Sequence, residues 1–136
     1  MKPEELAAQE AAHMEREGWY SHYVFPEDDH SRAVNCHTHG VRESFGHPDL
    51  QLVLPIAPEK ASDLLRSFVL EVKKGRYFKD GQVVDDLLQD GFKVKFVKVD
   101  EGGREVLRVI LPDPQGNVEK DAMDEAYAAQ YQGCDA

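Results

Sequence analysis

Two histidines separated by one residue are the side chains in this sequence best suited to chemistry. If the segment around them is a strand, His37 and His39 project from the same face, because side chains alternate along an extended chain. Two adjacent imidazoles can reach one metal ion, and zinc takes nitrogen ligands at roughly 2.0–2.1 Å. We therefore predict a divalent-metal site at His37 and His39, with zinc as the expected ion.

A third ligand is needed, because a catalytic zinc site combines three protein ligands with one open position. His22 lies in the middle of the strand expected before this one, and a hairpin of the right register would set it beside the pair. His47 is the other candidate, with Asp49 as an oxygen ligand or a hydrogen-bond partner. The predicted metal ligands are thus His37 and His39 with His22 or His47, and the sequence leaves that choice open.

Each candidate also has a purely structural interpretation. Histidines on a sheet often serve only as hydrogen-bond partners of their neighbours. The proline after His47 holds its backbone extended, so that its ring is placed to hydrogen-bond within the turn. Cys36 directly precedes His37, but adjacent strand side chains point to opposite faces and cannot share the hydrogen bond that activates a thiol. We interpret Cys36 as a small buried hydrophobe and assign no catalytic residue.

The sequence patterns predict the strands and helices that must position these side chains. An early proline, acidic residues after it and Gly18 predict an N-terminal helix over residues 1–17. Apolar residues at i, i+3, i+4, i+7, i+8 and i+11 predict a long amphipathic helix from Pro58 to Gly75. Residues 83–89 are interpreted as one or two further helical turns. Strands are predicted at Trp19–Phe25, Ala33–Val41 and Leu50–Leu54, from Phe92 onwards, and at Val106–Leu111, the last two forming a hairpin.

This order of elements indicates the fold class. Strands that come in runs, without regular alternation with helices, are typical of an α+β domain. We predict a mainly antiparallel sheet of about five strands, with one long amphipathic helix packed on one face and an N-terminal helix. The 136 residues suit a single domain, with a core over residues 18–116 and an acidic, partly ordered tail over residues 117–136.

Composition excludes several classes of function. The chain has 16 basic and 26 acidic side chains and a formal charge of −10, which would repel nucleic acid. The apolar runs fall far short of the roughly 20 residues that cross a bilayer, so no membrane span is expected. The N-terminus lacks the apolar centre of a signal peptide, which predicts a cytoplasmic protein with Cys36 and Cys134 as free thiols. Neither a P-loop nor a dinucleotide fingerprint is present, so no cofactor-binding residue is assigned.

Four short motifs, taken in order, carry a family resemblance. They are Gly18-Trp19, Gly46-His47-Pro48-Asp49-Leu50, Gly75-Arg76-Tyr77-Phe78-Lys79-Asp80-Gly81 and Leu111-Pro112-Asp113. Together they resemble a bacterial family called domain of unknown function 4262, from Gly18 to about Gly116. The resemblance implies a small cytoplasmic α+β domain, and it supplies no activity. The segment Asn35-Cys36-His37-Thr38-His39-Gly40 departs from the family, where many relatives carry apolar or small residues before the glycine.

Two classes of function follow from these observations. The first is a metal-binding domain and, in its fullest form, a metal-dependent hydrolase in which bound water is the nucleophile. The alternative is a non-catalytic protein-binding or regulatory module of the immunity or accessory type, and in either class the chain is a candidate homo-oligomer. Metal content separates the two classes, because only the first requires an ion.

Overall fold

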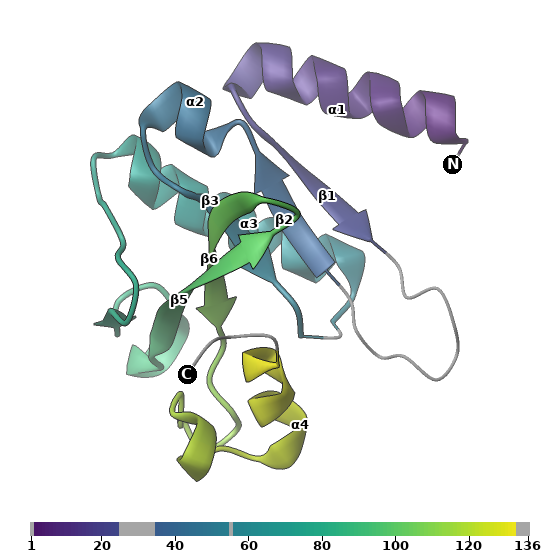
Figure 1. Ribbon diagram of the computed structural model, residues 1–136. Helices are drawn as coiled ribbons and strands as arrows, with labels where there is room; N and C mark the ends of the chain where they lie inside the picture. The colour runs from purple at the N-terminus through teal and green to yellow at the C-terminus, as the bar shows by residue number, and fades with distance from the viewer. Residues whose placement is uncertain (1, 25–34, 55, 133–136) are drawn as a thin grey trace.

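A six-stranded sheet organises the computed structural model, which describes residues 2–24, 35–54 and 56–132 (Figure 1). The order of strands across the sheet is β1-β2-β3-β6-β5-β4. In chain order the strands are β1 Tyr20–Val24, β2 Asn35–His39, β3 Asp49–Leu52, β4 Val83–Val84, β5 Val94–Glu101 and β6 Arg104–Ile110. The last residue of the strand predicted at Trp19–Phe25, the first two of that predicted at Ala33–Val41, and the predicted free thiol Cys134 lie outside the described residues.

The direction of the central strands corrects the predicted sheet. The α+β class is confirmed, but the sheet is mixed, because β3 and β6 run parallel while the other neighbouring strands are antiparallel. After β3 the chain passes through a helix to the far edge of the sheet, and the β5–β6 hairpin then returns β6 to the side of β3. A long connection therefore sets the direction of β6 relative to β3, whereas sequence patterns indicate only local structure.

One long helix packs on a face of this sheet, and the other lies along its β1 edge (Figure 1). The helices are α1 Pro3–Glu17, α2 Val41–Phe45, α3 Pro58–Lys73 and α4 Glu125–Ala128. The helix α3 corresponds to the predicted long amphipathic helix, and α1 corresponds to the predicted N-terminal helix. The two have nearly equal lengths, 16 residues for α3 and 15 for α1. The left-handed Gly18 ends α1 at φ 86°. Within the described residues, every helix is too short or too polar to cross a membrane.

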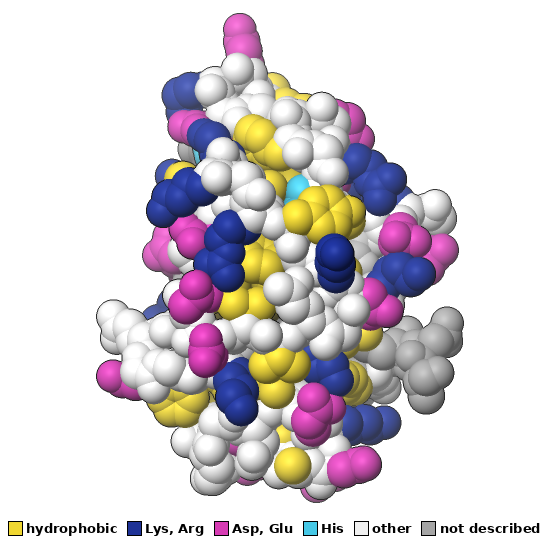
Figure 2. Space-filling model, turned by 90° about the vertical axis from the view of Figure 1, so that its left-hand side faces the viewer, with side chains coloured by type: hydrophobic (Ala, Val, Ile, Leu, Met, Phe, Trp, Pro, Cys, Tyr) yellow, Lys and Arg dark blue, Asp and Glu magenta, His cyan; other side chains and the backbone are white. Residues whose placement is uncertain are grey.

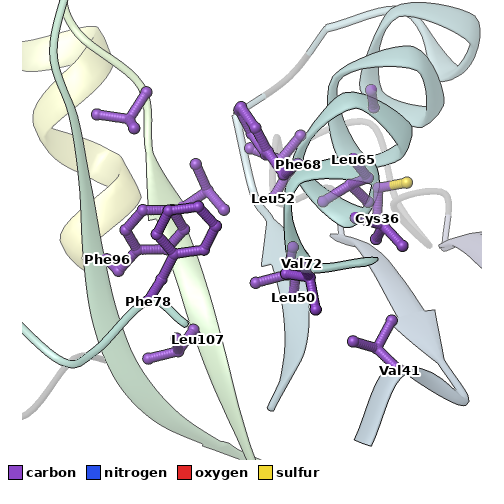
Figure 3. Close-up of a cluster of buried hydrophobic side chains, with 14 of the residues drawn as sticks. Cys36, Val41, Leu50, Leu52, Leu65, Phe68, Val72, Phe78, Phe96 and Leu107 are labelled. Atoms are coloured by element: carbon purple, nitrogen blue, oxygen red, sulfur yellow. The ribbon is translucent and has the colours of Figure 1, made fainter. Parts of the chain in front are cut away.

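The core lies between α3 and the sheet. The predicted apolar stripe of α3 is buried through Ala61, Leu65, Phe68, Val69 and Val72. Figure 3 shows Leu65, Phe68 and Val72 of α3 beside Cys36 of β2 and Leu50 and Leu52 of β3. Farther along the sheet the ring of Phe78 stacks on that of Phe96, with centroids 4.5 Å apart. By contrast α1 has no buried residue, and the strand that it contacts most is the edge strand β1.

Two segments differ from or extend the predictions. Residues 83–89 do not form the expected helical turns: Val83 and Val84 pair with β5 as the short strand β4, and a single 3₁₀ turn follows at Gln89–Gly91. The predicted hairpin of β5 and β6 is confirmed. Beyond β6, α4 is flanked by 3₁₀ turns at Lys120–Ala122 and Ala129–Tyr131. On the face shown in Figure 2, basic side chains are interspersed with acidic ones rather than gathered into one basic surface.

Candidate functional site

Three histidines stand side by side on the face of the sheet opposite to α3. His37 and His39 project from this face of β2, and the antiparallel register pairs His22 of β1 with His37. The ring centroids of His22 and His37 are 5.5 Å apart, and those of His37 and His39 are 4.7 Å apart. We call these three side chains the histidine row. The register that the sequence left open thus brings His22 to the pair.

A carboxylate from the far hairpin organises the polar groups beside the row. Oε1 of Glu101 accepts hydrogen bonds from Nε2 of Gln51 at 2.7 Å and Nδ2 of Asn35 at 3.2 Å. Oε2 accepts two bonds from Arg104, at 2.7 Å from Nη2 and 3.1 Å from Nε. Nδ1 of His37 lies 3.3 Å from Oε1 of Glu101 and 2.9 Å from Oδ1 of Asn35. Glu101 therefore connects β2, β3 and the β5–β6 hairpin at one point.

These contacts select one tautomer of His37. Because Asn35 donates its amide hydrogen to Glu101, its oxygen faces the imidazole and can only accept. Nδ1 of neutral His37 must then carry the ring proton, which leaves a lone pair on Nε2. The side chain is nearly buried, with 9% of the residue exposed. His37 is thus an oriented imidazole with one nitrogen available to a ligand.

Burial and neighbouring charges lower the pKa of His37 and of His39, so both rings are neutral at pH 7. Burial lowers the pKa of His37 to about 4, with His39 and Arg104 acting in the same direction and Glu101 opposing them. Burial also lowers the pKa of His39, again with help from Arg104. Burial opposes ionisation of Glu101, but its hydrogen bonds from Arg104 and Gln51 outweigh that effect and lower its pKa. The result is a neutral imidazole pair beside an ionised carboxylate.

The two outer members of the row have different partners. Nδ1 of His22 lies 2.6 Å from Oε2 of Glu10 on α1. The ring of His39 stacks on Tyr20, with centroids 5.1 Å apart and an interplanar angle of 27°. Among the described residues the imidazole of His39 has no hydrogen-bond partner. His22 is therefore held through one nitrogen, and His39 is held by ring contacts.

His47 lies away from the row and both of its ring nitrogens are used. It is 1% exposed; Nδ1 donates to the carbonyl of Pro48 at 2.7 Å, and Nε2 accepts from the backbone of Phe78 at 3.0 Å. Asp49 is also buried, and its Oδ1 accepts from the hydroxyl of Thr38 at 2.7 Å. The structural interpretation of His47 accounts for all of its contacts, and the structure does not bring it to the other candidate ligands.

The remaining candidates define what this arrangement can do. Cys36 is 2% exposed on the opposite face, and burial raises the pKa of its thiol to about 11, which agrees with a buried hydrophobe rather than a nucleophile. In residues 2–24, 35–54 and 56–132, no group of three or more His, Cys, Asp or Glu side chains is arranged to hold a metal ion. A preformed three-ligand zinc site is therefore not present in the part of the chain that the structure describes.

Sequence reasoning missed the polar partners of the row. No role was predicted for Glu101 or Arg104, and Gln51 was predicted only as part of the strand Leu50–Leu54. No spacing in the sequence connects them to His37, since Glu101 is far along the chain and reaches β2 only through the order of the strands. Polar residues on strands otherwise rich in Val and Leu were the available signal, because such residues on a covered sheet need partners.

Comparison with known proteins places the chain within one family. A family model described as Domain of unknown function (DUF4262) matches residues 13–118, a span that contains all six described strands. No curated protein and no solved structure matches the chain. The match therefore shows the family and supplies no reaction.

Proposed function

The chain belongs to the family described as domain of unknown function 4262, and on this fold we propose that His37 and His39 bind a divalent transition metal ion. One observation carries the proposal: Asn35 and Glu101 both contact Nδ1 of His37 and leave Nε2 with its lone pair. Metal-binding histidines typically donate their second ring nitrogen to a carboxylate or another oxygen in this way.

The protonation state of the pair supports the same function. A metal ligand must be a neutral imidazole, so protons compete with the ion at low pH. Burial lowers the pKa of both His37 and His39, so that neither ring must lose a proton before it binds an ion at pH 7. The ionised Glu101 offsets part of the positive charge that an ion brings.

The proposed site has two protein ligands. The arrangement of the described side chains offers no group of three, so the pair leaves the other coordination positions to water or to an external ligand. His22 is the nearest further imidazole, and its side chain would have to change rotamer to join the site. His47 is not included, because both of its nitrogens are already bonded. Imidazole ligands suit zinc, nickel and copper, and zinc remains the expected ion.

A hydrolase is the fuller form of this proposal. Zinc with an open position lowers the pKa of a bound water to about 7, which makes that water a nucleophile at neutral pH. The open positions at a two-histidine site support this chemistry. It depends on metal binding, and metal binding is therefore the property to test first.

The test is a metal titration of protein purified without a histidine tag. After treatment with a chelator, zinc and nickel are titrated separately by calorimetry, and the metal content of untreated protein is measured by elemental analysis. We expect saturable binding that weakens by at least about tenfold in His37→Gln and in His39→Gln, since each change removes one of two ligands. Glu101→Gln weakens binding less, because it removes only the partner of a ligand.

A matched control separates this site from nonspecific binding. His13→Gln removes a histidine that lies outside the row, and it should leave the affinity unchanged. Circular dichroism of each variant shows whether the fold is kept. If wild-type protein is metal-free and binds neither ion, or if the glutamine variants bind as wild type, the proposal is wrong. The working hypothesis is then the non-catalytic protein-binding or regulatory module, for which light scattering gives the oligomeric state.

A further inference from the structure

A pocket of about 450 Å³ lies where α1, β1 and α3 meet, at the outer edge of the sheet. Pockets that bind small molecules typically have volumes of about 300–1,000 Å³. The walls come from three elements that are distant in sequence: Gln9 and Arg16 from α1, Ser21 from β1, and Ser62 and Arg66 from α3. The pocket therefore exists only because α1 packs across the edge strand.

The pocket contains hydrogen-bond donors that the fold does not use. The hydroxyl oxygens of Ser21 and Ser62 are 3.0 Å apart, so one hydroxyl donates to the other. The accepting hydroxyl keeps its own hydrogen, which can be donated to a ligand. Arg66 is exposed, and among the described residues its guanidinium has no hydrogen bond or ion pair. A hydroxyl and a guanidinium with unused donors thus face the same space.

The charge of the lining favours an anion. Arg16 and Arg66 both line the pocket, whose lining has one carboxylate, that of Glu10. Nε of Arg16 lies 3.6 Å from Oε1 of Glu17, so Arg66 is the lining guanidinium without an ion pair among the described residues. Glu10 is already engaged by His22 at 2.6 Å. The guanidinium of Arg66, without an ion pair among the described residues, stands out in a chain with a net charge of −10. Guanidinium groups recognise carboxylate and phosphate oxygens through paired hydrogen bonds.

Apolar side chains on the same lining define the rest of the ligand. Leu6 of α1 and Trp19, which precedes β1, line the pocket beside the polar groups. We propose that this pocket binds a small organic anion, with its carboxylate or phosphate on Arg66 and the serine hydroxyls and its apolar part against Leu6 and Trp19. The site does not depend on metal binding, although Glu10 and Tyr20 border both the pocket and the histidine row.

The experiment is a titration followed by ¹H–¹⁵N NMR in the presence of a chelator, so that it is independent of any metal. Benzoate and inorganic phosphate are the two probes, and they distinguish a carboxylate from a phosphate preference. We expect at least one probe to produce saturable shifts at the amides of Ser21, Ser62 and Arg66. Arg66→Gln should weaken that binding by about tenfold or more, because hydrogen bonds to charged groups contribute roughly 1.5–3 kcal/mol.

Two further variants make the result decisive. Ser62→Ala removes a hydroxyl without a change in charge, and it should also weaken binding of the same probe. Arg42→Gln removes an exposed arginine on α2, away from the pocket, and should leave binding unchanged. The proposal is overturned if neither probe gives saturable shifts at these amides. It is equally overturned if Arg66→Gln binds as wild type, or if Arg42→Gln weakens binding as much as Arg66→Gln does.

Discussion

The Nε2 atom of His47 accepts a hydrogen bond from the backbone N–H of Phe78 at 3.0 Å. This contact ties the turn before β3 to the segment after α3. Both residues are 1% exposed, and the ring of Phe78 continues into the core by stacking on Phe96. The imidazole of His47 thus acts as a fixed crosslink between two parts of the chain that no strand pairing joins.

Replacement of His47 by alanine should lower the free energy of unfolding by about 3 kcal/mol. The change leaves the buried N–H of Phe78 without an acceptor, which costs about 1–3 kcal/mol, and opens a cavity in addition. Urea unfolding measures the difference. His39→Ala is the matched control, and it should cost about 1 kcal/mol or less, because His39 is half-buried with only ring contacts. Equal losses in the two variants would contradict the role of His47.

A second prediction concerns the close approach of Gly40 to α1. Gly40 has φ +97°, and a Cβ atom there would lie 2.6 Å from the carbonyl oxygen of Gly18. Gly75 has a similar φ of +103°, but a Cβ atom there would meet nothing within 4 Å. Both alanine variants have the same left-handed backbone strain, so the difference between their free energies of unfolding reports the steric clash at Gly40. We expect Gly40→Ala to be less stable than Gly75→Ala by at least about 1 kcal/mol in urea unfolding; equal stabilities would be inconsistent with the packing of α1.

The stability of the metal-free protein should fall in acid because of His37. Its pKa is about 4 in the folded protein and 6.5 in the unfolded reference. Between these values the unfolded chain binds more protons, so the contribution is complete above pH 6.5 and is lost as the pH falls toward 4. The shift corresponds to roughly 3 kcal/mol at most. The groups facing this imidazole are Glu101, His39, Arg104 and His22.

This pH dependence is measured by urea unfolding in a chelator at several pH values from 7 to 4. His37→Gln serves as the reference, because it keeps a polar side chain but cannot titrate. The stability of wild type should fall more steeply than that of the variant across this range, while carboxylates that do not contact His37 contribute equally to both proteins. Parallel curves for the two proteins would show that His37 is not held neutral.

The thiol of Cys36 should react only when the protein opens. Burial raises its pKa to about 11, and it is 2% exposed, so neither the thiolate nor access is available at neutral pH. In a Cys134→Ser background, labelling by iodoacetamide should be slower than that of a free cysteine by at least about a hundredfold. The rate should rise with urea as the fold opens. Fast labelling in the absence of urea would place Cys36 at an accessible position instead.

Local patterns predicted the elements around the site well. The stripe from Ala61 to Val72 predicted α3 because a helix buries one side chain in every three or four. The last two predicted strands form the expected hairpin of β5 and β6. The alternation in β2 placed His37 and His39 on one face. The prediction of helical turns over residues 83–89 was wrong, because a two-residue edge strand takes its conformation from pairing with β5 rather than from its own composition.

The sequence by itself determined that this chain makes an α+β domain of its family and that two histidines share one side of a strand. Only the tertiary structure decided that β6 lies parallel to β3 and that Glu101 reaches Nδ1 of His37. The physical reason is the distance along the chain over which each feature is determined. Side-chain periodicity is set by neighbours a few residues apart, whereas the partners of His37 are chosen by which strands pair, and that depends on burial of the whole core.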